Sequence, residues 1–180
     1  MILGKMLMSM MLLTSCDSSQ YMKDYYITNQ DSLVQIRTLS QTLANNYAFI
    51  KLTIRKKSGK LELMSHGESR NNVTMYLNPT DLSLISEHSF DECDPAVLQR
   101  FRTMYQDNDL REILNLFEAI EPKAIRISQG GVFVALGETL ESPNPNLEGG
   151  ILMTFEPELN NSRIVEQIDT NVYLYDDLVY

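Results

Sequence analysis

The sequence predicts an α+β fold in which a two-layer antiparallel sheet is covered by helices. Two observations lead to this class. Several short runs alternate apolar and polar residues, which is typical of strands buried on one face only. Between them lie longer segments whose apolar residues recur at steps of three and four, which is typical of amphipathic helices. One-sided strands and one-sided helices bury their apolar faces against each other.

The first half of the chain opens with a predicted helix. Asp31 is its expected cap, and five apolar residues fall on one helical face: Leu33, Ile36, Leu39, Leu43 and Tyr47. The period then changes to two at residues 50–55, and a turn at residues 57–60 leads to a second alternating run at 61–63. A third strand is expected at 73–77 and a short fourth strand at 82–86.

The second half repeats this order of elements. Apolar stripes predict helices from Val97 to Tyr105 and from Leu110 to Ile120. Because only residues 106–108 separate them, they are expected to fold back as a helical hairpin. Strands are then expected at 125–127, 132–136, 151–155, 163–168 and 171–176, with a long loop over 137–150.

The two halves, residues 31–90 and 91–180, therefore share a plan of helix, strand, glycine turn, strand, loop and strand. Short matches accompany it, such as Gly67-Glu68-Ser69 against Gly137-Glu138-Thr139. The sequence leaves two explanations open: a structural repeat, or the ordinary order of elements in an antiparallel α+β protein.

Before these elements lies an N-terminal stretch of another character. Lys5 supplies a positive charge, residues 6–13 are apolar apart from Ser9, and Leu13-Thr14-Ser15-Cys16 follows. This stretch resembles the signal peptide and lipobox of bacterial lipoproteins. The resemblance implies cleavage before Cys16 and attachment of a lipid to its thiol. The domains expected are a signal peptide at 1–15, a polar tether at 16–30 and an α+β domain at 31–180, although Tyr21, Tyr25 and Tyr26 could dock on the domain or start a helix.

Location and partners follow from this resemblance and from charge. The protein is expected at the cell membrane or outer membrane, anchored through Cys16, with its domain in the periplasm or outside. The full chain has a net charge of −9, and without Lys5 it has 14 basic and 24 acidic residues. Nucleic acid is not an expected partner, because the phosphate backbone dominates such binding.

Cys93 has no expected disulfide partner once Cys16 carries a lipid. Its acidic neighbours are expected to raise the pKa of its thiol. A metal site formed by His88, Asp91, Cys93 and Asp94 is an alternative, but its spacing matches no standard site. Asp94 before Pro95 is better interpreted as a helix N-cap.

No sequence motif of catalysis is present. The chain lacks a nucleophile elbow, a phosphate-binding glycine loop and a zinc-protease helix, and its two histidines, His66 and His88, are far apart in sequence. Gly130-Gly131 is interpreted as a hairpin turn. We therefore expect neither enzymatic activity nor a cofactor.

Two segments are candidates for interaction. Five basic residues fall within ten positions of an acidic chain: Lys51, Arg55, Lys56, Lys57 and Lys60. They could contact anionic lipids or an acidic partner, or they could protect an exposed sheet edge. The other segment is the loop from Glu138 to Gly150, which contains Ser142-Pro143-Asn144-Pro145-Asn146.

The sequence thus predicts a lipid-anchored envelope protein that binds a ligand or another envelope protein. Two alternatives stay open. One is an envelope hydrolase with an unrecognised site, and the other is a structural subunit of a surface assembly that pairs through the strand Val172 to Tyr175.

Overall fold

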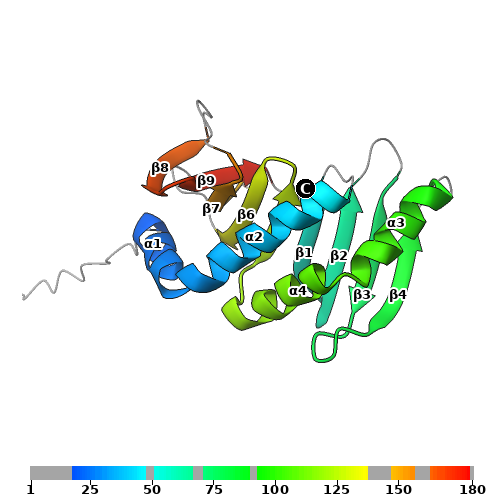
Figure 1. The fold of residues 1–180 in the computed structure, drawn as a ribbon. Helices are drawn as coiled ribbons and strands as arrows, with labels where there is room; N and C mark the ends of the chain where they lie inside the picture. The colour runs from blue at the N-terminus through cyan, green and yellow to red at the C-terminus, as the bar shows by residue number, and fades with distance from the viewer. Residues whose placement is uncertain are drawn as a thin grey trace, which may run out of the picture.

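The computed structural model describes residues 18–47, 51–66, 71–89, 93–137, 147–156 and 163–178. They form four helices and one antiparallel sheet of nine strands, so the predicted α+β class is confirmed (Figure 1). The helices are α1 (Ser18–Thr28), α2 (Gln30–Asn46), α3 (Pro95–Tyr105) and α4 (Asn108–Ile120). The strands are β1 (Lys51–Lys57), β2 (Lys60–His66), β3 (Val73–Leu77), β4 (Leu84–Ser89), β5 (Ala124–Ser128), β6 (Gly131–Gly137), β7 (Leu147–Thr154), β8 (Ile164–Asp169) and β9 (Val172–Leu178).

The strands lie in the order β4-β3-β2-β1-β5-β6-β7-β9-β8. The two halves of the chain meet where β1 pairs with β5. A two-residue turn joins β1 to β2, and both turn residues have positive φ, 52° at Ser58 and 74° at Gly59. Such a turn suits the twist of a hairpin and fixes its register, so that Arg55 lies opposite Glu62.

The main core forms between the helices and one set of alternating strand residues. Residues such as Leu52, Ile54, Ile125 and Val134 belong to it and are fully buried. Helix α2 packs along α4 and contacts β5 and β6. Burial of this apolar area stabilises the fold by roughly 25 cal/mol for each Å² removed from water.

Helices α3 and α4 lie where the sequence predicts them. The Asp94 side chain accepts a hydrogen bond from the Ala96 N–H with Pro95 in the first turn, so the predicted N-cap is confirmed. The predicted helical hairpin is wrong. The two helices follow one another across the sheet, and α4 packs against α2 (Figure 1), because the main core offers the apolar stripe of α4 a larger partner than α3 does.

Helix α1 occupies most of the segment predicted as a tether at 16–30. Its Met22 and Tyr26 are buried, and the Tyr25 hydroxyl donates to the Ile120 carbonyl over 2.8 Å. The Tyr26 hydroxyl donates to Asp169 over 2.7 Å. Tyr25 and Tyr26 therefore belong to a helix and also dock on the domain, whereas Tyr21 is 50% exposed.

Helix α2 differs from its prediction at one point. Asp31 is not the cap. Asn29 holds that position without a capping side-chain hydrogen bond, and Asp31 lies in the first helical turn. A carboxylate there still interacts favourably with the positive end of the helix dipole.

The edges of the sheet are β4 and β8. Strand β9 lies between β7 and β8, so both edges of Val172 to Tyr175 are paired within the chain. Strands β1 and β2 are also interior, which contradicts the interpretation that the basic residues protect a sheet edge. Strand β7 begins at Leu147, so the predicted loop over 137–150 is shorter than expected.

Candidate functional site

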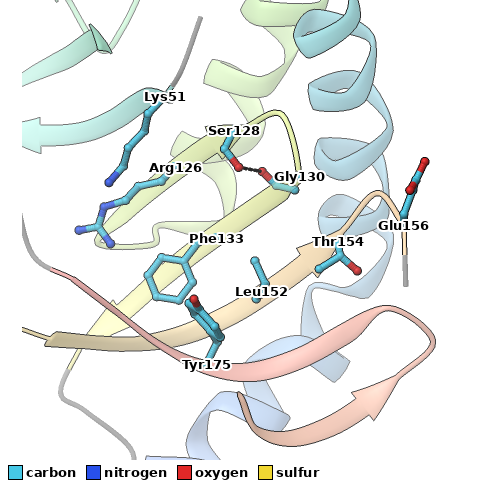
Figure 2. Close-up of a pocket in the computed structure, with 10 residues that line it drawn as sticks. Lys51, Arg126, Ser128, Gly130, Phe133, Leu152, Thr154, Glu156 and Tyr175 are labelled. Carbon is cyan, nitrogen blue, oxygen red and sulfur yellow. Dashed lines mark hydrogen bonds between the residues drawn. The ribbon is translucent and has the colours of Figure 1, made fainter. Parts of the chain in front are cut away.

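A hollow of about 430 Å³ opens on the side of the sheet that faces away from the main core; we call it the β5–β9 hollow (Figure 2). Lys51 at the start of β1 and Arg126 in β5 both line it, and Glu156 lies at its rim. Because Lys51 pairs with Ser128 and Thr53 with Arg126, the two cations are diagonal neighbours on the same face. The hollow thus has two positive side chains along one wall.

Hydroxyl groups and apolar side chains make up the rest of this hollow. Phe133 and Leu152 lie below the two cations, with Ser128, Thr154 and Tyr175 around them (Figure 2). The Ser128 hydroxyl donates to the Gly131 carbonyl over 3.2 Å. Thr154 is only 3% exposed, and its Oγ1 has no hydrogen-bond partner among the described residues. A buried hydroxyl without a partner is costly unless a ligand or water satisfies it.

The apolar floor depends on one glycine. Gly150 in β7 lies opposite Ala135 of β6 and Tyr175 of β9. A Cβ at Gly150 would lie 2.9 Å from the Phe133 ring, so the ring occupies the space that a side chain would need. Phe133 can then meet Tyr175 edge to face, with their ring centroids 5.8 Å apart. Edge-to-face contact of this kind is favourable between aromatic rings.

Arg126 is held from two sides. Its guanidinium lies 5.4 Å from the centroid of the Phe133 ring, and it forms an ion pair with the buried Glu148. Lys123 pairs with the same carboxylate over 2.6 Å. Burial alone would raise the pKa of Glu148, but the hydrogen bonds from Lys123 and Arg126 outweigh it and lower the pKa. Glu148 is therefore a carboxylate at neutral pH and keeps Arg126 in place.

A second hollow of about 300 Å³ lies on the other side of Arg126. Its lining is strongly basic: Arg55, Lys56, Lys57, Lys123 and Arg126, with Ala124 and Glu148. It brings together Arg55, Lys56 and Lys57 of the predicted basic cluster with Lys123 and Arg126, which were not predicted.

Arg55 and Lys57 of the predicted basic cluster bind a buried acid. Glu62 is 1% exposed, and its carboxylate forms ion pairs with Arg55 and, over 3.2 Å, with Lys57. The Tyr76 hydroxyl donates to Glu62 over 2.8 Å. Burial acts to raise the pKa of Glu62, yet these three donors outweigh it and lower the pKa. Much of the positive charge of the cluster is thus balanced within the sheet.

The other basic residues of the cluster diverge. Lys56 points toward α4 and pairs with Glu118 over 2.9 Å. Lys60 lies over the Tyr76 ring, 5.8 Å from its centroid. Lys51 lines the β5–β9 hollow. The cluster therefore does not act as one exposed patch.

Comparison with known proteins gives no relative. No family model, curated protein or solved structure matches the chain.

Neither histidine lines either hollow. His88 is exposed and meets Tyr76 edge to face, with ring centroids 5.7 Å apart. His66 lies at the end of β2, where burial and the charges of Lys51 and Arg55 lower its pKa. The two histidines therefore lie in separate surroundings.

The alternative of a metal site at His88, Asp91, Cys93 and Asp94 has no support in the described residues, among which no three His, Cys, Asp or Glu side chains converge. Asp91 lies outside them, and Asp94 caps α3. The pKa of the Cys93 thiol is raised, as predicted, although burial contributes more than the neighbouring Asp94.

Two predicted features lie outside the described residues: Cys16 with its lipobox, and residues 138–146 of the long loop. In the part of the chain that the structure describes, no helix has the length and apolar character needed to cross a bilayer.

Glu62, Arg126 and Glu148 were not predicted as site residues from the sequence. A usable signal existed for the first two, because each is a charged residue within an alternating run and must share a sheet face with its cross-strand neighbours. Glu148 fell in a segment interpreted as loop. Its role depends on the pairing of β7 with β6, which brings it close to β5.

Proposed function

We propose that this chain is a bacterial cell-envelope lipoprotein, anchored through Cys16, whose α+β domain is a binding module rather than an enzyme. The observation that carries the binding role is the β5–β9 hollow, with Lys51 and Arg126 beside an aromatic floor. Hollows of this size, mainly apolar with a few convergent polar groups, are typical of ligand sites. An acidic protein that holds two cations at such a hollow is suited to an anionic ligand or partner.

The anchor is supported by the residues before the domain. A basic residue, an apolar run and the sequence Leu13-Thr14-Ser15-Cys16 resemble the export and lipidation signal of lipoproteins. We expect the Cys16→Ser variant to leave the membrane fraction while its domain keeps the far-ultraviolet circular dichroism of the wild type. Persistent membrane association of the folded variant would refute the anchor.

The binding role is tested by affinity capture of the natively lipidated protein. Lys51→Glu reverses a charge at the hollow, and Lys60→Glu makes the same change at the β1–β2 turn, away from it. We expect a specific envelope protein or ligand to be captured by the wild type and by Lys60→Glu, but not by Lys51→Glu. Loss of capture in Lys60→Glu alone would instead place binding on the basic turn.

A second candidate, a structural subunit, is favoured by the edge strand β4. Leu84 and Ile85 are 46% and 48% exposed there, and an open edge with apolar side chains can pair with another strand. Analytical ultracentrifugation tests this candidate. An assembly that forms in the wild type and dissociates in Ile85→Lys supports it, whereas a monomer at high concentration contradicts it.

We also infer a two-layer arrangement built from two related halves. Strands β1 and β5 pair at the middle of the sheet, and β2-β3 and β6-β7 extend outward from them on opposite sides. Helices α2 and α4, which precede β1 and β5, pack against each other. Both β1–β2 and β5–β6 have two-residue turns that end in glycine, Ser58-Gly59 and Gln129-Gly130. Separately expressed halves that associate into a folded heterodimer would support this inference, and failure to associate would count against it.

A further inference from the structure

We propose that the β5–β9 hollow binds a small organic acid that carries one carboxylate on an apolar or aromatic body. This inference rests on the binding role proposed above and assigns it a ligand class. It is argued from the charge, the floor and the unsatisfied hydroxyl of the hollow.

The charge of the hollow selects a monoanion. Of the described side chains that line it, Lys51 and Arg126 are positive and Glu156 is negative. Arg126 also shares Glu148 with Lys123, which removes part of its positive field. Lys51 and Arg126 would attract a carboxylate, whereas the second charge of a phosphate dianion would be repelled by Glu148 and Glu156.

The position of Arg126 suits a carboxylate. The guanidinium is planar and offers parallel N–H donors, which match the two oxygens of a carboxylate. Glu148 and the Phe133 ring fix its orientation, so little side-chain entropy is lost when a ligand binds. Lys51 reaches the same hollow from β1 (Figure 2).

The floor accounts for the apolar body. Phe133 and Tyr175 form a preassembled aromatic pair, with Leu152 beside them (Figure 2). A planar or branched apolar group of a ligand could pack on these side chains, and so be removed from water, without rearrangement of the sheet. The combination of one charged wall and an apolar floor excludes a purely polar ligand, such as a neutral sugar, as the best fit.

Thr154 supplies an observation that is independent of the charge and of the apolar floor. Its hydroxyl oxygen is buried and has no hydrogen-bond partner within the described structure, although the residue lines the hollow. A ligand oxygen could receive its proton, and the Ser128 and Tyr175 hydroxyls lie in the same lining. The hydroxyl therefore marks where a polar atom of the ligand is expected.

The experiment is calorimetric titration of the full, detergent-solubilised chain with 3-phenylpropanoate and with its neutral amide. We expect one site, with the acid binding about tenfold more tightly than the amide because a charge-assisted hydrogen bond distinguishes them. Lys51→Gln should weaken the acid about tenfold and leave the amide unchanged. Lys57→Gln is the matched control, since Lys57 pairs with Glu62 and does not line this hollow.

A further pair of probes distinguishes a free acid from the end of a protein chain, which share the same carboxylate chemistry. A short peptide with a C-terminal phenylalanine and its C-terminal amide are titrated in the same way. Tighter binding of the free peptide than of 3-phenylpropanoate identifies a chain terminus as the source, and the reverse identifies a small metabolite.

Three results would overturn the proposal: equal binding of acid and amide, equal effects of Lys51→Gln and Lys57→Gln, or no heat with any probe at millimolar concentration. The wider binding role fails separately. The binding role is refuted if the wild type and Lys51→Glu capture the same proteins and ligands, whatever result the titrations give.

Discussion

Gly150→Ala is the most direct test of how the hollow is built. The added Cβ would lie 2.1 Å from the Val134 carbonyl oxygen and 2.9 Å from the Phe133 ring. Ordinary contact for such atoms begins about 1 Å further out, and a carbonyl within a paired strand cannot move without disturbing its ladder. We expect the free energy of unfolding to fall by about 3 kcal/mol, the upper end of the range for overpacked cores. Urea unfolding followed by circular dichroism measures it.

Gly130→Ala is the matched control at the rim of the same hollow. A Cβ there meets nothing within 4 Å, and its φ is not positive. We expect the free energy of unfolding to stay within about 0.5 kcal/mol of the wild type. Equal losses in the two variants, or a neutral Gly150→Ala, would show that β6 and β7 do not approach as described and that Phe133 does not occupy the space at Gly150.

Three more predictions concern stability. Glu62→Gln should lower the free energy of unfolding at pH 7 by about 2 kcal/mol, because the buried carboxylate accepts charge-assisted hydrogen bonds. Its pKa is lowered in the folded state, so this stabilisation is present above the unfolded pKa of about 4.3 and is lost as the pH falls through the folded value. Urea unfolding at pH 7 and at pH 3 should therefore show a difference between wild type and variant that shrinks in acid, and a constant difference would contradict the assignment. Thr154→Val should leave the free energy of unfolding unchanged or raise it by about 1 kcal/mol, since it removes a buried hydroxyl without a partner; a clear loss in thermal unfolding would reveal a partner. Met22→Ala should lower the free energy of unfolding by about 2–4 kcal/mol if α1 is part of the core, whereas Ile27→Ala, at a position 70% exposed on the same helix, should change it by less than about 0.5 kcal/mol. Equal, small effects of Met22→Ala and Ile27→Ala in chemical denaturation would show that α1 does not pack on the core and acts as a tether.

Several strands were predictable because their sequences alternate apolar and polar residues. Alternation such as Ile50, Leu52 and Ile54 is a local signal that needs no knowledge of the partner strand. The order of strands was not predictable in the same way. The pairing of β1 with β5, and the position of β9 between β7 and β8, depend on contacts between residues far apart in the chain.

Helix α1 was only one of the alternatives for its segment, for a different reason. Three of its apolar residues are tyrosines, and only Met22 and Tyr26, one turn apart, are buried. A polar segment with two such residues resembles a linker until the surface that receives it is known. The hydroxyls of Tyr25 and Tyr26 donate hydrogen bonds to that surface, at the Ile120 carbonyl and at Asp169.

The candidate site was the least predictable feature. Its cations could be read from the chain, but their partners come from other strands. The pair Arg55 and Glu62 was within reach, since a two-residue turn fixes their register. The hollow itself was not, because it joins Lys51, Arg126, Phe133 and Tyr175 from four strands.

Under the proposed lipidation of Cys16, the early start of α1 would restrict where this protein can act. Ser18 begins the helix, and it follows Cys16 by two residues, which span at most about 7 Å when fully extended. With a lipid on Cys16, the folded domain would be held close to the bilayer surface and would not move freely on a long flexible linker. Encounters with other anchored proteins would then be lateral, within the plane of one membrane. A flexible insertion before Ser18 would lengthen this reach without touching the fold.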